Sequence, residues 1–341
     1  MALTFHAVAD GPDSAAWVGV VARLWPAYER WYLKEGDAAR PSLQECREAL
    51  DRHMPEFVPT WERQVALAGG GEGFARFLSL WRPPGYLSAC TQAVWPGTEP
   101  LLVRNYDYST LAFDAVCLHT QWAGRRIMGT SDCLIGLVDG INDAGLVASL
   151  TFGGRTELGP GFGMPIILRY LLDTCTTSAE AGLVLQRVPS HMAYNVTVLD
   201  ADRELLTAEV APGRDTVLTT RPVASNHQSR EGETGLGATS STAPDTIARE
   251  RYLLQRSKLH HDSAEHFTGL FLEPPLYALD FERGFGTLYT AAYRPRSRTV
   301  EYRWPGLRWR LALDSFEPGS RVVEYPVGSG VVATPTGVVI P

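Results

Sequence analysis

Residues 89–108 read ACTQAVWPGTEPLLVRNYDY, and the interpretation of the whole chain starts from this stretch. Cys90 follows a helix-breaking segment, Arg82-Pro83-Pro84-Gly85-Tyr86, and opens an apolar run, while Arg104 and Asp107 lie on the next apparent strand. A cysteine becomes a useful nucleophile only when a neighbour holds it as the thiolate or takes its proton. No histidine lies near Cys90 in the sequence, so the usual base of cysteine enzymes is missing here.

The missing base can be the α-amino group of Cys90 itself, released by cutting the bond between Ala89 and Cys90. A free α-amino group has an ordinary pKa of about 8, so an N-terminal cysteine carries nucleophile and base together. Asp107 near that ammonium would orient it, and Arg104 near the sulfur would favour the thiolate. Arg104 and Asp107 point to opposite faces of a regular strand, so we expect a bulge or a strand end to bring both to the thiol.

Composition is that of an ordinary globular protein. The chain has 341 residues, 45% hydrophobic and 20% charged, which allows one large domain or two smaller ones. A net charge of -7 gives no support for nucleic acid as a partner. The N-terminus has no signal-peptide pattern, and no apolar run reaches the roughly 18–20 residues that cross a bilayer, so we expect no membrane association.

The five cysteines are odd in number, widely spaced and without a CxxC pair. This pattern argues against a disulfide framework and against a structural zinc site. We therefore expect a cytoplasmic protein with no metal, in which Cys90 stays a free thiol.

The pattern of elements changes at about residue 90. Apolar spacing and caps predict helices over residues 14–34, 42–52, 60–67 and 73–80, with Ser42 as an N-cap and Glu45 three residues later. Strands are predicted over 100–107, 115–123, 126–130, 146–152, 194–200, 204–210 and 215–220, and a hairpin over 286–294 and 299–304. Helices are predicted over 165–174, 178–187 and 245–260, with Ser178 as the cap of the second. This order favours a layered α+β fold, with a helical N-terminal segment over residues 1–89 and a β-rich body over 90–341.

Two asparagines are candidates for stabilising an oxyanion. Residues 139–146 (DGINDAGL) are interpreted as a tight turn entering a strand, which places Asn142 at a strand edge. Asn226 ends a β-like run in Ala224-Ser225-Asn226-His227. A turn asparagine explains each one alone. The ordered set of Cys, Arg-x-x-Asp, Gly-x-Asn-x-x-Gly and Asn-His makes coincidence less plausible.

These motifs carry a resemblance to a known family. Residues 90–108, 139–146, 225–227 and 286–289 together resemble the N-terminal nucleophile (Ntn) hydrolases, in particular the acyl-coenzyme A:6-aminopenicillanic acid acyltransferase (peptidase C45) group. The resemblance covers roughly residues 40–305. It implies a four-layer αββα sandwich with residues 90–341 as the catalytic core. It also implies that residues 1–89 become a pro-segment or a separate subunit after self-cleavage.

The resemblance also implies residue roles. Cys90 would be the nucleophile, released by cleavage after Ala89, with Arg104 beside its sulfur and Asp107 binding the new α-amino group. Asn226 would supply the side-chain oxyanion donor.

Two further roles follow from the same resemblance. Asn142 would contribute near the substrate carbonyl through its backbone N–H. The family also has an arginine at the start of a helix after the Asn-His element, and Arg251 fits this position best, with Arg249 as the alternative alignment.

Five side chains are candidates for substrate binding. They are aromatic or polar residues near the proposed site, namely Tyr106, Tyr108, Phe152, Phe162 and His227. Core packing is an equal explanation for Tyr106 and Tyr108, and packing or capping is the ordinary explanation for His227.

The sequence therefore predicts a self-processing N-terminal cysteine amidohydrolase or acyltransferase. It would act on a small-molecule amide or acyl thioester through a thioester acyl-enzyme, without a cofactor. The N-terminal segment is expected to stay bound to the core, and a homo-oligomer is compatible with the sequence. One alternative is an unprocessed protein with an accessory or binding role. The other is a papain-like Cys-His enzyme that uses His227.

Overall fold

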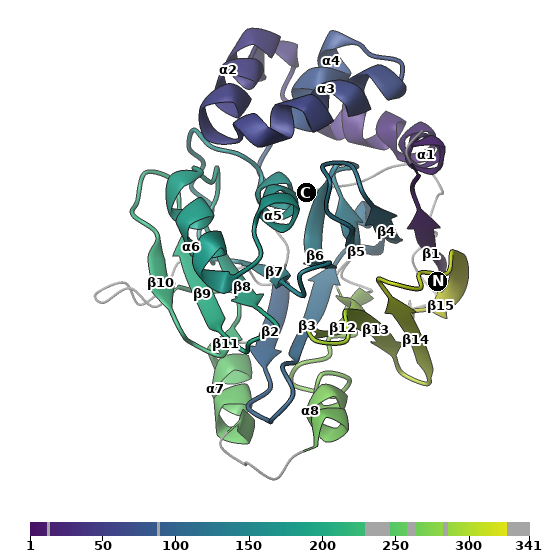
Figure 1. The fold of residues 1–341 in the computed structure, drawn as a ribbon, viewed down its shortest axis with the longest axis vertical. Helices are drawn as coiled ribbons and strands as arrows, with labels where there is room; N and C mark the ends of the chain where they lie inside the picture. Colours follow the sequence, from purple (N-terminus) through teal and green to yellow (C-terminus); the bar gives the residue numbers. More distant parts are fainter. Residues whose placement is uncertain (12–13, 87–88, 229–245, 258–262, 282–285, 326–341) are drawn as a thin grey trace.

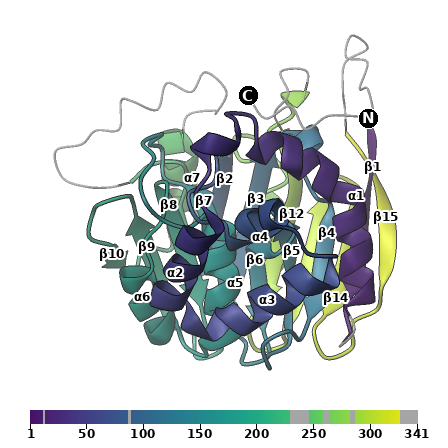
Figure 2. The same ribbon diagram turned by 90° about the horizontal axis from the view of Figure 1, so that it is seen from above.

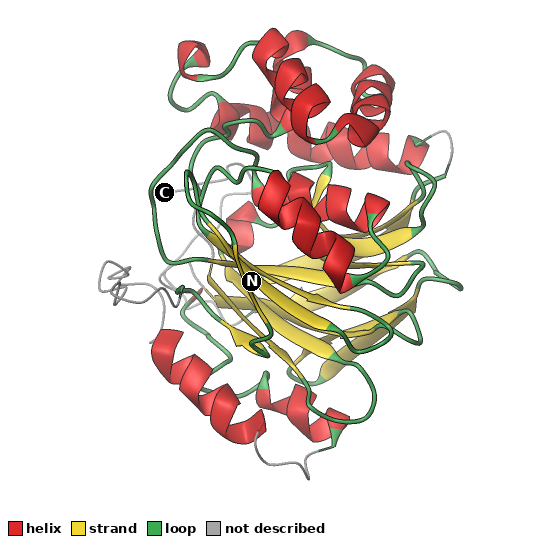
Figure 3. Cartoon of the chain, turned by 60° about the vertical axis from the view of Figure 1, so that its left-hand side comes forward, coloured by secondary structure: helices red, strands yellow, loops and turns green. Residues whose placement is uncertain are grey.

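The strands form two sheets that face each other, and helices lie on the outer side of both sheets (Figures 1 and 3). The computed structural model describes residues 1–11, 14–86, 89–228, 246–257, 263–281 and 286–325. The helices are α1 (Ala15–Tyr32), α2 (Leu43–His53), α3 (Val58–Leu67), α4 (Glu72–Ser79), α5 (Met164–Thr174), α6 (Ser178–Arg187), α7 (Thr246–Ser257) and α8 (Ala264–Leu270). The predicted α+β class is confirmed.

The larger sheet has the strand order β10-β9-β8-β7-β6-β5-β4-β1-β15. Its strands are β1 (Ala2–Ala9), β4 (Val116–Thr120), β5 (Ile127–Asp132), β6 (Gly136–Asn142), β7 (Val147–Phe152), β8 (Tyr194–Leu199), β9 (Leu205–Val210), β10 (Val217–Thr219) and β15 (Gly319–Glu324). The first strand, β1, pairs in parallel with β4 and antiparallel with β15. Strand β1 was not predicted, because few of its residues are buried and its partners lie far along the chain.

The smaller sheet has the order β11-β2-β3-β12-β13-β14 and is antiparallel throughout its described pairs. Its strands are β2 (Ala89–Val94), β3 (Leu102–Tyr108), β11 (Val223–Ala224), β12 (Gly286–Arg294), β13 (Thr299–Trp304) and β14 (Leu307–Ala312). The hairpin of β12 and β13 was predicted. Cys90 on β2 stands opposite Tyr106 on β3, and Gln92 stands opposite Arg104.

Alternation along β2 and β3 separates two groups of polar side chains. Gln92 faces the larger sheet, because its amide binds Ser149 on β7 and Thr197 on β8. Asn105 faces the other way and donates to the carbonyls of Phe271 and Leu276 beside α8. Side chains in register with Gln92 therefore lie between the sheets, whereas those in register with Asn105 lie toward α7 and α8.

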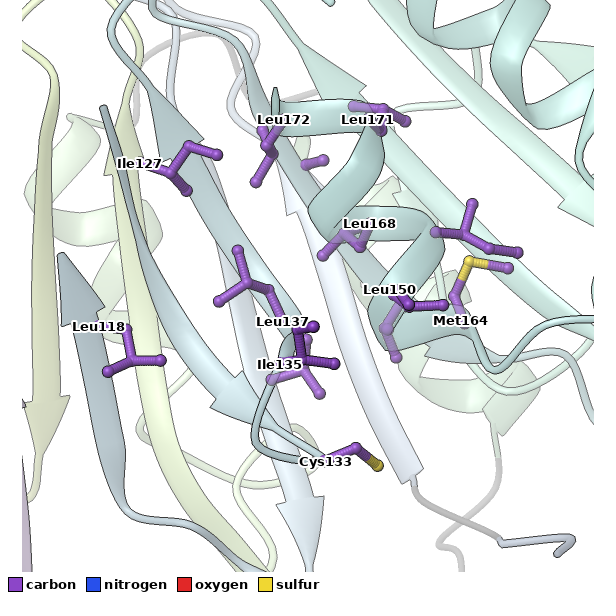
Figure 4. Packing of buried hydrophobic residues seen from close by; sticks show 14 of the residues in the cluster. Leu118, Ile127, Cys133, Ile135, Leu137, Leu150, Met164, Leu168, Leu171 and Leu172 are labelled. Carbon is purple, nitrogen blue, oxygen red and sulfur yellow. The ribbon is translucent and has the colours of Figure 1, made fainter. Parts of the chain in front are cut away.

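Helix α5 packs closely on the larger sheet. Figure 4 shows Leu168 and Leu172 of α5 turned toward the strands, among other buried apolar side chains. The approach depends on glycine, because a Cβ atom at Gly136 would lie 2.4 Å from Pro165 and one at Gly140 would lie 2.9 Å from Leu172. The α5 side of β6 is thus filled by the helix.

The helices α1 to α4 gather at one end of the molecule (Figures 1 and 2). Helix α2 begins with the predicted capping box, in which Ser42 and Glu45 satisfy each other's backbone N–H groups. Helix α1 is tied to the sheets, because Trp17 donates to the carbonyl of Leu134 at 2.9 Å. Across the described residues, no helix combines the length and the apolar character needed to cross a membrane.

Several predicted boundaries change. Residues 139–142 are the end of β6 and not part of a turn, so the turn comprises only the residues between β6 and β7. The N-cap of α6 is Thr177, one residue before the predicted Ser178. Of the predicted helix 245–260, residues 246–257 are helical and the remainder lies outside the described residues.

Candidate active site

The thiol of Cys90 is buried between the two sheets beside an arginine. Cys90 is the second residue of β2 and is fully buried. Its Sγ lies 3.0 Å from Nη2 of Arg104, which donates to it. Burial raises the pKa of the Cys90 thiol, although the charge of Arg104 acts in the opposite direction. The neutral thiol is therefore favoured in the intact chain, and a base is needed to activate it.

Arg104 is held in place by the larger sheet. Its Nη1 donates to Oδ2 of Asp139 and to the carbonyl of Val138, both at 2.7 Å, and Arg104 and Asp139 are both fully buried. Strand β6 has one extra residue at Val138, because Thr130 of β5 pairs with Asp139 while the next residue, Ser131, pairs with Leu137. This bulge leaves the carbonyl of Val138 available to accept from Arg104. A bulge in one sheet thus fixes the guanidinium that faces the thiol in the other.

Asp139 is a site residue that sequence reasoning missed. It also accepts hydrogen bonds from Tyr289 at 2.6 Å, Tyr293 at 2.5 Å and Thr130 at 2.8 Å. The signal was present, because an aspartate within the apolar run LVDGI (residues 137–141) is a charge that needs a buried partner.

Asp107 lies on the opposite face of β3 from Arg104. Its Oδ1 accepts from Thr287 at 2.6 Å, and its Oδ2 lies 3.4 Å from Nη1 of Arg249. Burial raises the pKa of Asp107 to about 6, and Arg249 moderates this shift. The described pairing of β3 with β2 contains no bulge, in contrast to the expectation. A register shift occurs in the pairing of β3 with β12, between Thr287 and Tyr289 of β12.

Asn226 binds the backbone nitrogen of Cys90. Its Oδ1 accepts from the Cys90 N–H at 3.0 Å and from Nη2 of Arg249 at 2.8 Å, while its Nδ2 donates to the carbonyl of Phe152 at 3.2 Å. Strand β11 ends at Ala224, so the Asn226 side chain satisfies the N–H of Cys90 just past the end of the β2–β11 ladder. The side chain therefore links β2, β7 and α7 around the bond that follows Ala89.

Arg249, and not Arg251, contacts the start of β2. Arg249 is buried and also donates to the carbonyl of Cys90 at 3.2 Å and to the hydroxyl of Thr91. Arg251 is exposed on α7. Residues two apart on a helix point about 200° apart, so only one of them can face β2. This corrects the preferred sequence alignment in favour of its alternative.

Asn142 lies elsewhere and has a different role from the one expected. Its backbone N–H donates to the carbonyl of Leu146 at 3.0 Å, inside the turn that follows β6. Its side chain donates to the carbonyls of Leu172 and Cys175 at the end of α5. These bonds hold the turn to the helix, so the backbone N–H is not free to bind a substrate carbonyl.

The five candidate substrate-binding residues separate into two groups. Tyr106 lies beside the site, with its ring centroid 5.0 Å from the guanidinium carbon of Arg104. The ring of Tyr108 lies next to that of Tyr106 in a tilted arrangement, with ring centroids 5.9 Å apart. Phe152 contributes its carbonyl to Asn226.

Phe162 and His227 make other contacts. The ring of Phe162 is fully buried and packs against Trp81, with ring centroids 4.8 Å apart. Both ring nitrogens of His227 are engaged, Nε2 with Glu250 at 2.6 Å and Nδ1 with Thr246 at 3.1 Å.

The assembled groups are those of acyl chemistry. A thiol, its own backbone nitrogen, two guanidinium groups, a carboxylate and an amide converge on the start of β2. Among the residues that the structure describes, no cluster of three His, Cys, Asp or Glu side chains could hold a metal ion. The fold and the site together define an α+β protein with a buried cysteine–arginine centre.

Comparison with family models identifies the family. The model of the acyl-coenzyme A:6-aminopenicillanic acid acyl-transferase family matches residues 95–309, and the chain belongs to this family. The resemblance stated from the sequence is thus confirmed. The match includes Arg104, Asp107, Asn226 and Arg249, and it begins five residues after Cys90. Family membership supports an enzyme of the amide hydrolase or acyltransferase type.

Solved structures with similar backbones were also found. Penicillin V acylase from Agrobacterium tumefaciens is 15% identical with a TM-score of 0.46, over 68% of this chain and 90% of that chain. The C2A mutant of conjugated bile acid hydrolase from Clostridium perfringens is 12% identical with a TM-score of 0.46, over 71% and 99%. The N-acylethanolamine-hydrolyzing acid amidase ortholog of Caenorhabditis elegans is 12% identical with a TM-score of 0.43, over 61% and 93%. Comparison with curated proteins gave no match.

Proposed function

We propose that this chain is a self-processing N-terminal cysteine enzyme that hydrolyses or transfers an acyl group at an amide bond through a thioester. One observation carries the proposal: the sulfur and the backbone nitrogen of Cys90 each have a dedicated buried partner, Arg104 and Asn226. A buried backbone N–H needs an acceptor in any protein, but a structural cysteine needs no buried cation beside its sulfur. An N-terminal nucleophile needs both, because its sulfur attacks while its nitrogen takes the proton.

Processing would begin with attack by Cys90 Sγ on the carbonyl carbon of Ala89. The acyl group moves from nitrogen to sulfur, the peptide C–N bond breaks, and Cys90 gains a free α-amino group. Water then hydrolyses the thioester, which leaves the carboxylate of Ala89 and the thiol of Cys90. Arg104 would stabilise negative charge on the sulfur during attack.

The same groups would then act on a substrate. The free α-amino group accepts the thiol proton, and the nearby carboxylate of Asp107 orients the ammonium that forms. For Asn226 to bind the oxyanion, its Nδ2 has to exchange the carbonyl of Phe152 for the substrate oxygen. Release of the acyl group to water gives a hydrolase, and release to an amine gives an acyltransferase.

The proposal extends to the surroundings of the enzyme. The N-terminal segment would remain bound after cleavage, because α1 is anchored to the sheets by buried hydrogen bonds of Trp17 and Tyr28. All five cysteines are buried and unpaired, in keeping with a reducing cytoplasm.

Intact-mass analysis of the purified chain tests the processing step. We expect two fragments, residues 1–89 and 90–341, from the wild type and a single full-length species from Cys90→Ala. Cys117→Ala is the matched control, because Cys117 is also buried but lies on β4, and it should be cleaved normally. A wild-type chain that stays intact under all conditions, or a Cys90→Ala chain that is still cut, would refute the mechanism.

One observation favours a second candidate function. Cys90 is fully buried in the intact chain, which suits an unprocessed accessory or binding protein. That role predicts a permanently intact chain whose Cys90 resists alkylation. The papain-like alternative predicts loss of activity in His227→Ala, and the contact of His227 with Glu250 gives it little support.

A further inference from the structure

A cavity of about 60 Å³ lies between α1 and the ends of β3 and β5. At about 30 Å³ for each water molecule, it has room for about two waters, or for a group of similar size. Its wall combines aromatic and aliphatic side chains with two carboxyl groups. The residues used below are Trp31, Tyr86, Tyr108, Phe113, Asp114 and Asp132. The N-terminal segment therefore supplies one side of the cavity and the β-rich body supplies the other.

Two carboxyl groups of the cavity wall are able to carry negative charge. Asp114 accepts from the hydroxyls of Tyr28 at 2.5 Å and Ser131 at 2.9 Å, and Asp132 accepts from the backbone N–H of Cys133 at 2.9 Å. Within the described residues, neither carboxylate forms an ion pair. Burial raises the pKa of Asp114 to about 7 and that of Asp132 to about 6, so both gain from a proton or from a cation placed in the cavity.

A second feature also indicates a ligand. Trp31 is only 4% exposed and lines the cavity, and its indole N–H has no hydrogen-bond partner among the described residues. Buried indole N–H groups usually find an acceptor. An oxygen atom in the cavity would supply it.

Two neighbouring tyrosines connect the cavity with the strand that carries the proposed nucleophile. Tyr106 stands opposite Cys90 in the sheet, and its ring lies 5.9 Å from that of Tyr108, which lines the cavity. Tyr86 also lines it and precedes Cys90 by four residues, which a chain spans in at most about 14 Å.

We propose that this cavity binds the amine end of the substrate, a primary ammonium with a neighbouring oxygen, about the size of a glycyl group. The ammonium would donate to Asp132 and Asp114 and lie against the aromatic rings, and the oxygen would accept from Trp31. The inference rests on the proposed function, because it makes the cavity part of the site of Cys90. The proposed substrates are therefore amides that end in an aminoacyl group with a free amine.

Binding of two isosteric probes tests the inference. Glycinamide and propionamide differ only in an ammonium that replaces a methyl group. With the purified wild-type protein, ligand-observed NMR or calorimetry should show glycinamide binding at least tenfold more tightly. Asp132→Asn should remove this preference, and Trp31→Phe should weaken glycinamide binding. Asp314→Asn, a change of an exposed carboxylate, should leave the preference unchanged.

The outcomes separate this inference from the proposed function. Equal affinities for the two probes, no binding of either, or an undiminished preference in Asp132→Asn would overturn the amine site. If Asp132→Asn does not fold, the wild-type comparison and Trp31→Phe decide the question. The intact mass is recorded on the same samples. A processed protein that does not prefer glycinamide to propionamide would refute only the cavity assignment. An intact protein that does prefer glycinamide would refute only self-processing.

Discussion

Arg104 is a buried cation whose position depends on one carboxylate. Asp139 neutralises it and in turn accepts from Tyr289, Tyr293 and Thr130. Breaking a buried ion pair leaves an uncompensated charge in the interior, at a cost of about 3–5 kcal/mol. We therefore predict that Asp139→Asn lowers the free energy of unfolding by about this amount, measured by urea denaturation.

The chain offers a matched control for this prediction. Asp314 pairs with Arg298 at 2.6 Å and with Arg126 at 2.9 Å, but all three side chains are exposed. Exposed pairs contribute about 0–1 kcal/mol, so Asp314→Asn should change stability little. Equal effects of the two substitutions would mean that Asp139 is not essential for holding Arg104.

The residues around Cys90 also show what spacing alone could predict. Arg104 was expected beside the sulfur, and the structure places its Nη2 3.0 Å from Sγ. Asp107 was expected on the same side, but strand alternation carries it to the face of α7. Local sequence indicates which residues share a strand, whereas the pairing of strands determines what each face meets.

The first half of helix α7 carries two arginines, and only one of them reaches the site. Arg249 contacts Thr91, Asp107 and Asn226, whereas Arg251 is exposed. We predict that Arg249→Gln slows formation of the 90–341 fragment at least tenfold and destabilises the fold by about 3 kcal/mol, because Asp107 loses its buried cation. Time-resolved intact mass and thermal unfolding measure the two effects.

Arg251→Gln is the control on the same helix. A substitution at an exposed position should change stability by less than about 0.5 kcal/mol and leave processing unaffected. The reverse result, with Arg251→Gln impaired and Arg249→Gln normal, would restore the original sequence alignment.

The N-terminal helices and the sheets are joined by a titrating network. Tyr28 of α1 donates to Asp114, which also binds Ser131 and lies near Asp132. The pKa of Asp114 is raised from 3.8 to about 7 by burial, so the folded state holds its proton at pH values where the unfolded chain has lost it. Ionisation of Asp114 therefore favours the unfolded state between these two values.

This gives a prediction for the stability of the whole molecule. Relative to Asp114→Asn, the wild type should lose stability as the pH rises from about 4 to about 7, measured by urea unfolding at a series of pH values. Asp314 has a lowered pKa, so the wild type compared with Asp314→Asn should not show this loss. A difference between wild type and Asp114→Asn that does not vary with pH would contradict the assigned burial of Asp114.

By itself, the sequence determined the elements with strong local patterns and the family. Apolar periodicity and the Ser42 cap predicted the N-terminal helices, and the stretch from Cys90 to Tyr108 carried the family resemblance. These features depend on residues close together in the chain, so their signals survive without a fold.

Only the tertiary structure decided which distant residues meet. Strand β1 has few buried residues of its own and exists because β4 and β15 pair with it. Asp139 faces Arg104 because β6 bulges at Val138 and the two sheets face each other, and the start of α7 selects Arg249 over Arg251. Burial and strand pairing fix such contacts, and neither is encoded in the spacing of any one segment.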